Sequence, residues 1–340
     1  MAVTFKAVRT DRELECPEID AGLRARGVEL VLLADGVSED DLCAALRDAD
    51  LLVMCYTPVT ARVIAGAPKL KGIVKYGVGI DAIDIAAAMA RGIPVVNVPE
   101  YSEETVAEGA FALMIALAKK LMPIGREMAE HGWAWPAPRW LGLDLAGRTL
   151  GLVGTGKIGR SMARMANGFR IRVIGYDPNV STETMRAAGI EKCTDLDALL
   201  QASDVVSIHA VLNADTRHLI GARELARMKP SAFLINVSRG AIVDEMALVA
   251  ALQGKRVAGA ALDVFSQEPL TRSGHPMSAL YAMDNVILFP HLTFYTQEAM
   301  ARLTEDTLAR CFEILEGRPV LVKSRDPRLR GQRDGVVFGE

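Results

Sequence analysis

The chain has 340 residues, of which half are apolar and 24% are charged, as is ordinary for a globular protein with room for two domains. Its formal net charge is −3 at pH 7, so no overall positive field favours the binding of nucleic acid. The basic stretch Lys323–Arg333 is interrupted by Asp326 and Pro327, and we expect it to be a solvated, poorly ordered terminus.

Three further features concern the compartment. The stretch Met1–Arg12 has no long apolar run before its charges, so we expect no signal peptide. The most apolar helical run, Ala107–Ala118, is shorter than the roughly 20 residues of a membrane span, and it predicts a buried core helix with no membrane role. The five cysteines are scattered without metal-ligand spacing, which predicts reduced thiols, no metal site and a cytoplasmic protein.

In the first third of the chain, short runs rich in β-branched residues alternate with helical patterns. Strands are expected at Phe5–Val8, Glu29–Leu33, Leu51–Met54, Gly72–Lys75 and Val95–Asn97. Helices are expected between them, for example at Asp40–Arg47 and Ile83–Arg91. This alternation indicates βαβ units and a parallel sheet that is covered on both faces.

The same alternation begins again after Gly147. Six strands are expected at Thr149–Val153, Arg172–Tyr176, Val205–His209, Phe233–Val237, Gly259–Val264 and Val286–Phe289. Helices are expected at Ile158–Asn167, Arg223–Met228, Met246–Gln253 and, after the last strand, Gln297–Leu315. Six parallel strands with crossover helices are typical of a dinucleotide-binding sheet. The fold class is therefore α/β, with two α/β domains.

A long apolar helix is predicted between the two regions, at Glu103–Leu121. The next segment, Met122–Leu143, holds all three tryptophans of the chain, which are Trp133, Trp135 and Trp140. These rings either line part of a substrate pocket or pack beneath a loop, and the sequence leaves both possibilities open.

The strand at Thr149–Val153 is followed at once by the glycine-rich loop Gly154-Thr155-Gly156-Lys157-Ile158-Gly159 and then by an amphipathic helix, which is the order that a dinucleotide-binding turn requires. Gly154 permits the tight turn, Gly156 lets the backbone approach a pyrophosphate, and Gly159 lets the helix pack on the strand. The first turn of the helix then offers N–H groups and a positive dipole end to the phosphates.

Asp177 ends the second strand of this domain. A carboxylate there accepts hydrogen bonds from the adenosine ribose hydroxyls and repels a 2′-phosphate. Arg172 lies earlier in the strand, so no evident phosphate partner follows the acid. The expected cofactor is NAD rather than NADP.

Three polar residues follow later strands of this domain and fit hydride transfer between a nicotinamide and a hydroxy acid. Arg239 suits a substrate carboxylate, which a guanidinium holds through two hydrogen bonds. His291 is suited to moving the hydroxyl proton, and a carboxylate such as that of Glu268 would stabilise its protonated form. Spacing alone does not distinguish His291 from the other histidines considered, His209, His218 and His275.

Several long motifs occur together along the chain. They are KYGVGID at 75–81, NVPE at 97–100 with VAE at 106–108, the GTGKIG loop, NVSRGAIVD at 236–244, ALDVFSQEP at 261–269 and Pro290-His291. In this order they resemble the D-isomer-specific 2-hydroxyacid dehydrogenase family over nearly the whole chain. The resemblance implies an NAD-dependent oxidoreductase that acts on the CH–OH group of a small D-2-hydroxy acid or, in reverse, reduces a 2-keto acid.

The family pattern implies that Arg239 binds the substrate carboxylate and carbonyl, that His291 is the acid/base and that Glu268 pairs with it. The substrate-binding residues implied are Lys75, Gly77, Val78, Gly79, Arg239 and His291. The cofactor-binding residues implied are Val78, Gly154, Gly156, Lys157, Ile158, Gly159, Asp177, Ala210, Val237, Arg239, Asp263 and His291.

The resemblance also implies a domain arrangement. A flavodoxin-like substrate (catalytic) domain would be discontinuous, at 1–100 and 295–340, and completed by the C-terminal helix. An NAD-binding Rossmann domain with a doubly wound parallel sheet would occupy 101–294. A homodimer is expected, with the Glu103–Leu121 region in its interface.

Some positions depart from the commonest family pattern. The stretch Leu292–Thr296 is bulky where many members carry small residues, and Gly109 stands where a larger residue often follows the VAE motif. Phe294-Tyr295-Thr296 is similar to D-lactate dehydrogenases, whereas Pro99-Glu100-Tyr101 and the GTGKIG loop resemble the glycerate and phosphoglycerate branches. D-3-phosphoglycerate dehydrogenase and glyoxylate/hydroxypyruvate reductase therefore stay open as alternatives. A non-enzymatic alternative is an NAD(H)-sensing interaction protein similar to the transcriptional co-repressors of this family.

Overall fold

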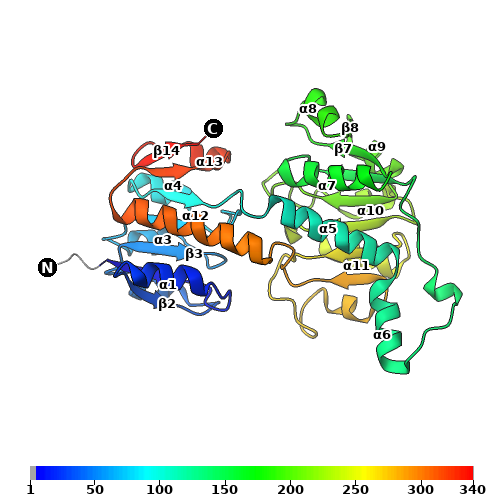
Figure 1. The fold of residues 1–340 in the computed structure, drawn as a ribbon, viewed down its shortest axis with the longest axis horizontal. Coiled ribbons are helices and arrows are strands. Elements are labelled where there is room, and N and C mark those ends of the chain that lie inside the picture. Colours follow the sequence, from blue (N-terminus) through cyan, green and yellow to red (C-terminus); the bar gives the residue numbers. More distant parts are fainter. Residues whose placement is uncertain (1–4, 340) are drawn as a thin grey trace. The chain divides into compact units, whose positions relative to one another are not determined.

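A computed structural model of the chain describes residues 5–339, which divide into two compact units. Unit 1 comprises residues 5–102 and 296–339, and unit 2 comprises Glu103–Tyr295. Each unit is built around its own parallel sheet with helices packed on it (Figure 1). The predicted α/β fold class is confirmed, and every strand expected from the sequence is present. No helix in residues 5–339 is both long enough and apolar enough to cross a bilayer.

The sheet of unit 1 has the strand order β2-β1-β3-β4-β5, which is the order of flavodoxin-like folds. Its strands are β1 (Lys6–Arg9), β2 (Glu29–Leu32), β3 (Leu51–Met54), β4 (Gly72–Lys75) and β5 (Val95–Asn97). Its helices are α1 (Pro17–Ala25), α2 (Glu39–Leu46), α3 (Ala61–Ala65), α4 (Ile85–Ala90) and α12 (Gln297–Leu315). The last of these lies beside α1 and against β3 and β4, so the segment that follows unit 2 belongs to the core of unit 1 (Figure 1).

Strands β3 and β4 of unit 1 are buried along their whole length, because helices cover both faces of the sheet. Gly72 begins β4, and a Cβ atom placed on it would lie 2.6 Å from Cδ1 of Ile314. The side chain of Ile314 in α12 therefore fills the space beside this glycine, which explains how α12 packs closely on the strand.

The basic segment Lys323–Arg333 is folded, so the expectation of a poorly ordered terminus is wrong. It lies between β13 (Val320–Val322) and β14 (Val336–Phe338), which pair in parallel, and it contains α13 (Pro327–Arg330). Leu329 is fully buried. The side-chain amide of Gln332 accepts a hydrogen bond from the N–H of Val95 at 2.7 Å and donates one to its carbonyl at 2.8 Å. This amide pairs with the edge strand β5 as a neighbouring strand would.

The sheet of unit 2 has the order β12-β11-β10-β9-β6-β7-β8, and its first six strands along the chain reproduce the doubly wound order of dinucleotide-binding folds. The strands are β6 (Thr149–Val153), β7 (Arg172–Tyr176), β8 (Glu191–Lys192), β9 (Val205–Ile208), β10 (Phe233–Asn236), β11 (Gly259–Leu262) and β12 (Val286–Leu288). The sequence predicted six of them and missed the two-residue strand β8, which is too short to carry a hydrophobic pattern.

The helices of unit 2 cover both faces of this sheet. They are α5 (Glu103–Ala118), α6 (Leu121–His131), α7 (Lys157–Gly168), α8 (Thr182–Ala187), α9 (Leu196–Ala202), α10 (Ala222–Arg227) and α11 (Glu245–Gln253), with short 3-10 helices η1 (Pro138–Trp140), η2 (Gly240–Ile242) and η3 (Ser278–Ala282). As predicted, Ala107–Ala118 is part of a largely buried helix, and α5 packs along α7 and against β10, β11 and β12.

The long helix expected at Glu103–Leu121 ends earlier than predicted, and a second helix follows it. Lys120 has a φ of 54°, in the left-handed region, which interrupts the helix between Ala118 and Leu121. The sequence did not predict α6. Within unit 2, α6 extends from the end of α5 (Figure 1), and none of its residues is buried.

Candidate functional site

The glycine-rich loop joins β6 to α7 at the point where the strand order of the unit 2 sheet reverses, between β6 and β9. Gly154 has a φ of 92°, and a Cβ on it would lie 2.6 Å from the backbone nitrogen of Ala210, which follows β9. A Cβ on Gly159 would lie 2.5 Å from the carbonyl oxygen of Gly154. Close backbone packing therefore requires glycine at both positions. The sequence analysis assigned a tight turn to Gly154, in keeping with its positive φ, and close packing to Gly159.

Gly156 differs from the other two glycines of the loop. A Cβ on it would meet no atom within 4 Å, so open space lies on this side of the backbone. The same residue caps α7 without a capping side chain, which leaves the positive end of the helix dipole facing that space. The loop therefore fits a dinucleotide, whose pyrophosphate needs close backbone approach at the middle glycine.

Asp177 lies directly beside this loop at the end of β7. Its Oδ2 accepts the N–H of Thr155 at 2.9 Å, and its Oδ1 accepts the N–H of Asn179 at 2.9 Å. A carboxylate has about four lone-pair positions, so these two bonds fix its direction and leave acceptor capacity for ribose hydroxyls. The placement of Asp177 fits the adenosine end of NAD.

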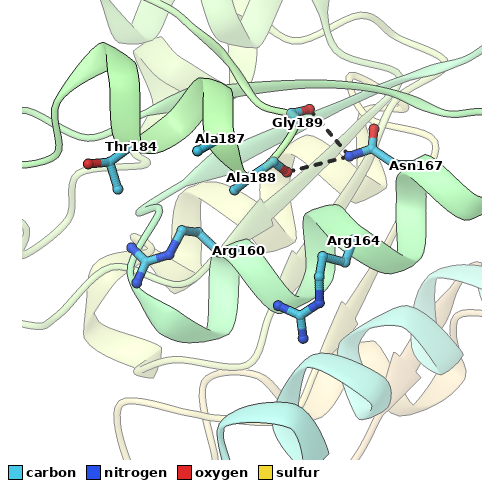
Figure 2. Close-up of a pocket in the computed structure, with 7 residues that line it drawn as sticks. All are labelled: Arg160, Arg164, Asn167, Thr184, Ala187, Ala188 and Gly189. Carbon is cyan, nitrogen blue, oxygen red and sulfur yellow. Dashed lines mark hydrogen bonds between the residues drawn. The ribbon is translucent and has the colours of Figure 1, made fainter.

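A groove of about 850 Å³ runs along the outer side of α7 next to α8 (Figure 2). Arg160, Arg164 and Asn167 line it from α7, but each has a partner within unit 2. Arg160 donates to the carbonyl of Thr155, Arg164 pairs with Glu104, and the amide of Asn167 lies within hydrogen-bonding distance of the carbonyls of Ala188 and Gly189. The groove contains none of the expected catalytic residues, and we do not assign it to the active site.

Arg239 is held in a turn that follows β10. The side chain of Asn236 donates to the carbonyl of Arg239 at 2.9 Å and accepts the N–H of Ser238 at 3.1 Å, which folds the backbone between them. Gly240 comes next, and a Cβ there would overlap the backbone of Phe265. Because Gly240 has no side chain, the Arg239 turn can lie directly against the segment that leads to Glu268.

Glu268 and His291 form the pair that the sequence predicted. Nδ1 of His291 lies 2.8 Å from Oε2 of Glu268, and Oε1 of Glu268 accepts the N–H of Phe265 at 2.9 Å. Burial by itself would raise the pKa of Glu268, but the hydrogen bond and charge of His291, the N–H of Phe265 and the charge of Arg239 together lower it below its ordinary value. The carboxylate form of Glu268 is therefore favoured.

Asp263, which follows β11, holds the turn that carries His291. Its fully buried carboxylate accepts the N–H of Leu292 at 2.9 Å, the N–H of Thr293 at 3.2 Å and the hydroxyl of Thr293. Burial raises the pKa of Asp263, although the Thr293 hydroxyl, the charge of His291 and the two N–H groups oppose the shift. His291 itself has a φ of 56° in this turn.

The other three candidate histidines, His209, His218 and His275, lie in surroundings typical of residues without a catalytic role. The Nε2 atom of His209 lies 2.9 Å from the Ser207 hydroxyl, and burial lowers the pKa of its imidazole to about 4. His275 lies between the carbonyl of Gln267 and the N–H of Met277, in the loop after Glu268. His218 is exposed. Of these four histidines, only His291 contacts a carboxylate within the described residues.

In unit 1, the residues expected to bind substrate lie at the end of β4. Lys75 is 5% exposed, and its Nζ lies 2.8 Å from Sγ of Cys55 and 5.2 Å from the ring centroid of Tyr56. Gly77 has a φ of 143°, which few other residues adopt. Asn97 of β5 donates to the carbonyl of Val78 at 2.6 Å and so fixes the loop. Val78 is exposed.

Asp11 organises the neighbouring loops of unit 1 and was not singled out by the sequence. It is buried, with a φ of 58°, at the end of β1. One carboxylate oxygen accepts the N–H groups of Cys55 and Tyr56, and the other accepts the N–H and hydroxyl of Thr57. These bonds fix the loop after β3, which carries the Cys55 and Tyr56 contacts of Lys75.

Two further residues at the site were visible in the sequence without a role. Asn236 opens the NVSRG motif, but only the structure shows that its side chain shapes the Arg239 turn. Thr293 was noted as bulky, and the structure shows it bonded to Asp263. The signal for both was their position beside a candidate catalytic residue.

Comparison with known proteins gives the family. Residues 111–293 match the model of the D-isomer specific 2-hydroxyacid dehydrogenase, NAD binding domain. The chain is 42% identical over 263 residues to a glyoxylate reductase of Korarchaeum cryptofilum, covering 76% of this chain and 78% of the relative. It is 40% identical over 270 residues to a D-3-phosphoglycerate dehydrogenase of Methanocaldococcus jannaschii, covering 79% of this chain but only 50% of the longer relative.

A solved structure agrees with these sequence matches. The D-lactate dehydrogenase of Aquifex aeolicus, complexed with NAD and lactic acid, superposes with a TM-score of 0.80 at 29% identity and covers 92% of this chain and 96% of its own. The predicted family, the NAD cofactor and the oxidoreductase class are confirmed by these matches. The chain belongs to the D-isomer specific 2-hydroxyacid dehydrogenase family, and unit 2 contains its NAD-binding domain.

Proposed function

We propose that this protein interconverts a small 2-keto acid and its D-2-hydroxy acid, with His291 as the acid/base, Glu268 as its partner and Arg239 as the carboxylate-binding residue. The observation that carries the proposal is the 2.8 Å contact between His291 and Glu268 beside the charge of Arg239. All three follow strands of the sheet whose first strand leads into the dinucleotide loop. A proton-transfer group and a carboxylate-binding cation are what such a reduction requires of the protein.

Each residue has a distinct part in this reaction. When bound, NAD supplies the hydride chemistry through its nicotinamide. In reduction, the guanidinium of Arg239 binds the substrate carboxylate, and Nε2 of His291 gives its proton to the oxygen of the keto group. Glu268 holds Nδ1 of His291 and favours the protonated ring before transfer. In oxidation, the same Nε2 takes the hydroxyl proton.

We also propose the cofactor and substrate contacts. The loop Gly154–Gly159, with Lys157 and Ile158, would hold the pyrophosphate, and Asp177 would hold the adenosine ribose. The remaining cofactor contacts proposed are Ala210, Val237, Asp263 and Val78. In unit 1, the N–H groups of Val78 and Gly79 donate to no acceptor within residues 5–339, which suits them to a substrate carboxylate.

Removal of the imidazole in His291→Ala is expected to lower kcat by a factor of about 10²–10⁴, because general acid catalysis is lost. Glu268→Gln keeps a hydrogen-bonding side chain but removes the charge that favours the protonated ring. We therefore expect the upper pH limit of keto-acid reduction to move to lower pH in this variant. Steady-state NADH oxidation across a pH series measures both effects.

The matched control for this experiment is His218→Asn. His218 is exposed and has a φ of 53°, a conformation that asparagine tolerates, so its kcat should stay close to that of the original protein. Unchanged turnover in His291→Ala would overturn the assignment. If the unsubstituted chain binds NADH tightly yet turns over no 2-keto acid, the NAD(H)-sensing alternative is favoured.

Asp177→Asn is expected to shift cofactor use toward NADPH. The substitution keeps one acceptor oxygen for the N–H of Thr155 but removes the charge that would repel a 2′-phosphate. Hydrogen bonds to a charged group contribute about 1.5–3 kcal/mol, so the ratio of kcat/KM for NADH over NADPH should fall by about tenfold or more. An unchanged ratio would show that Asp177 does not carry the preference.

For the substrate we propose a small 2-keto acid such as glyoxylate or hydroxypyruvate, and Lys75 favours a phosphorylated acid as the second candidate. Lys75 is 5% exposed and, within residues 5–339, its side chain forms no ion pair with a carboxylate. A buried ammonium is unfavourable without an anionic partner. A substrate phosphate would provide one, and D-3-phosphoglycerate carries it.

Lys75→Met separates the two substrates, because it keeps the length of the side chain and removes its charge. If the substrate is phosphorylated, kcat/KM for phosphohydroxypyruvate should fall by about 100-fold, equivalent to about 3 kcal/mol, while hydroxypyruvate is much less affected. Lys71→Met is the control, since Lys71 pairs with Asp50 away from the loop. Preference of the original protein for glyoxylate or hydroxypyruvate, unchanged in Lys75→Met, would assign the small acid.

We propose that the protein is a homodimer. The sequence placed the Glu103–Leu121 region in its interface, but α5 is largely buried within unit 2, whereas no residue of α6 is buried. We therefore propose that α6 and the tryptophan-containing segment that follows it contact the second copy. Large apolar side chains of this region are exposed in the single chain, namely Leu121, Met122, Met128, Trp133, Trp135 and Leu141. Trp135 is 76% exposed, so it does not pack beneath a loop of its own chain. Apolar side chains gathered in this way favour a protein–protein contact.

The mass in solution tests this proposal. Light scattering should give twice the chain mass for the original protein, and Leu121→Asp with Met122→Asp should give a single chain mass, because two charges would be buried without partners. The pair Val337→Asp and Phe338→Asp, also exposed but on β14, is the control and should leave the mass unchanged. A monomer in the original protein would contradict the proposal.

We propose a cytoplasmic location. All five cysteines lie in the described part of the chain and carry free thiols, which suits a reducing compartment. Cell fractionation with an antibody against the protein would test it.

A further inference from the structure

The turn that carries His291 adopts a backbone conformation that is uncommon for residues other than glycine. His291 has a φ of 56°, and it lies between Pro290 and the bulky stretch that begins at Leu292. Such conformations persist where the surrounding structure fixes them. The position of the imidazole therefore depends on what holds the residues directly after it.

Two contacts hold the C-terminal side of this turn. The first is the buried carboxylate of Asp263, which accepts both the N–H and the hydroxyl of Thr293 as well as the N–H of Leu292. The second is steric and comes from helix α5. A Cβ atom placed on Gly109 would lie 2.7 Å from Cβ of Thr293 and 2.9 Å from its Cγ2. Thr293 is thus fixed by a hydrogen bond on one side and by the surface of α5 on the other.

Gly109 is unusual for its position. It lies in the middle of the 16-residue helix α5, where glycine is unfavourable relative to alanine. Its φ is not in the left-handed region, so backbone conformation does not require glycine here. The space that it leaves is filled by the methyl-bearing side chain of Thr293. The packing against Thr293 is therefore the physical reason for this glycine.

We propose that Gly109 and Thr293 are a matched pair of positioning residues that set the place of His291, with Gly109 providing the space that lets Thr293 reach Asp263. The inference rests on the proposed function, because it assigns these residues to the positioning of the proposed acid/base. Neither residue touches the reacting atoms. They act through the backbone of residues 291–293.

The first experiment changes the size of the side chains at positions 109 and 293. Gly109→Ala should push Thr293 away from α5 and lower kcat for 2-keto-acid reduction by about 10- to 100-fold, since small misplacement of a reacting group has effects of this order. The same substitution should change the dissociation constant of NADH by less than about threefold. In a Thr293→Gly background, where the overlapping atoms are gone, Gly109→Ala should change kcat by less than about threefold. Gly168→Ala in α7, where a Cβ meets no atom within 4 Å, is the matched control and should leave kcat unchanged.

The second experiment separates the hydroxyl of Thr293 from its shape. Thr293→Val keeps the two branches at Cβ and the backbone N–H bond to Asp263 but loses the hydroxyl hydrogen bond, and it should lower kcat by about tenfold or more with little change in the KM for NADH. Thr293→Ser keeps the hydroxyl and should retain kcat within about threefold of the original protein. This pair stays informative even if Gly109→Ala does not fold, which the melting temperature reports.

The outcomes distinguish this inference from the proposed function. If the original chain reduces 2-keto acids but kcat is unchanged in Gly109→Ala and in Thr293→Val, the positioning role is overturned while the function stands. Equal effects of Gly109→Ala in the original chain and in the Thr293→Gly background would also overturn it, because matched residues must be coupled. If the original chain reduces no 2-keto acid and His291→Ala changes nothing, the proposed function itself fails.

Discussion

In a parallel sheet the carboxyl ends of neighbouring strands lie at the same edge, and this constraint assembles the chemistry of unit 2. The loops after β6, β7, β10, β11 and β12 leave that edge, and between them they carry the cofactor loop and the catalytic candidates. Each loop is then fixed by its neighbour. Asp263 binds the turn after β12, and Gly240 lets the turn after β10 approach the segment after β11. Residues far apart in sequence are thus held close together within unit 2.

Much of this arrangement was predictable from the sequence, for identifiable reasons. The buried strands are short apolar runs bounded by polar or glycine-containing loops, and the order of strands and helices followed from them. Gly154, Gly156 and Gly159 are specified by the backbone geometry of a single turn, which is local information. The choice of His291 was different, because spacing did not distinguish it from the other histidines and the family resemblance pointed to it. The 2.8 Å contact with Glu268 joins two loops that are separate in sequence, and spacing along the chain does not encode such a contact.

The features that the sequence missed depend on tertiary contacts or on exceptions to local rules. In α6, Pro123 and Gly125 are residues that usually interrupt helices, but Pro123 lies in the first turn, where proline is tolerated. The charges of Lys323–Arg333 indicated a solvated terminus, whereas its order comes from Leu329 and from the pairing of Gln332 with β5. No local sequence pattern predicts that a side-chain amide will make the hydrogen bonds that a neighbouring strand would make.

The side chain of Asp11 lies at the point of the unit 1 sheet where sheets of this strand order bind ligands. Sheets with the order seen in unit 1 bind ligands at the point between β1 and β3, where backbone N–H groups of the loops can capture an anionic cofactor. In this chain the side chain of Asp11 already accepts the N–H groups of Cys55, Tyr56 and Thr57 at that point. In unit 1 the carboxylate of Asp11 therefore occupies the backbone N–H groups that would bind a nucleotide in another sheet of this strand order. The same strand order therefore occurs in unit 1 with these loop N–H groups already bonded within the chain.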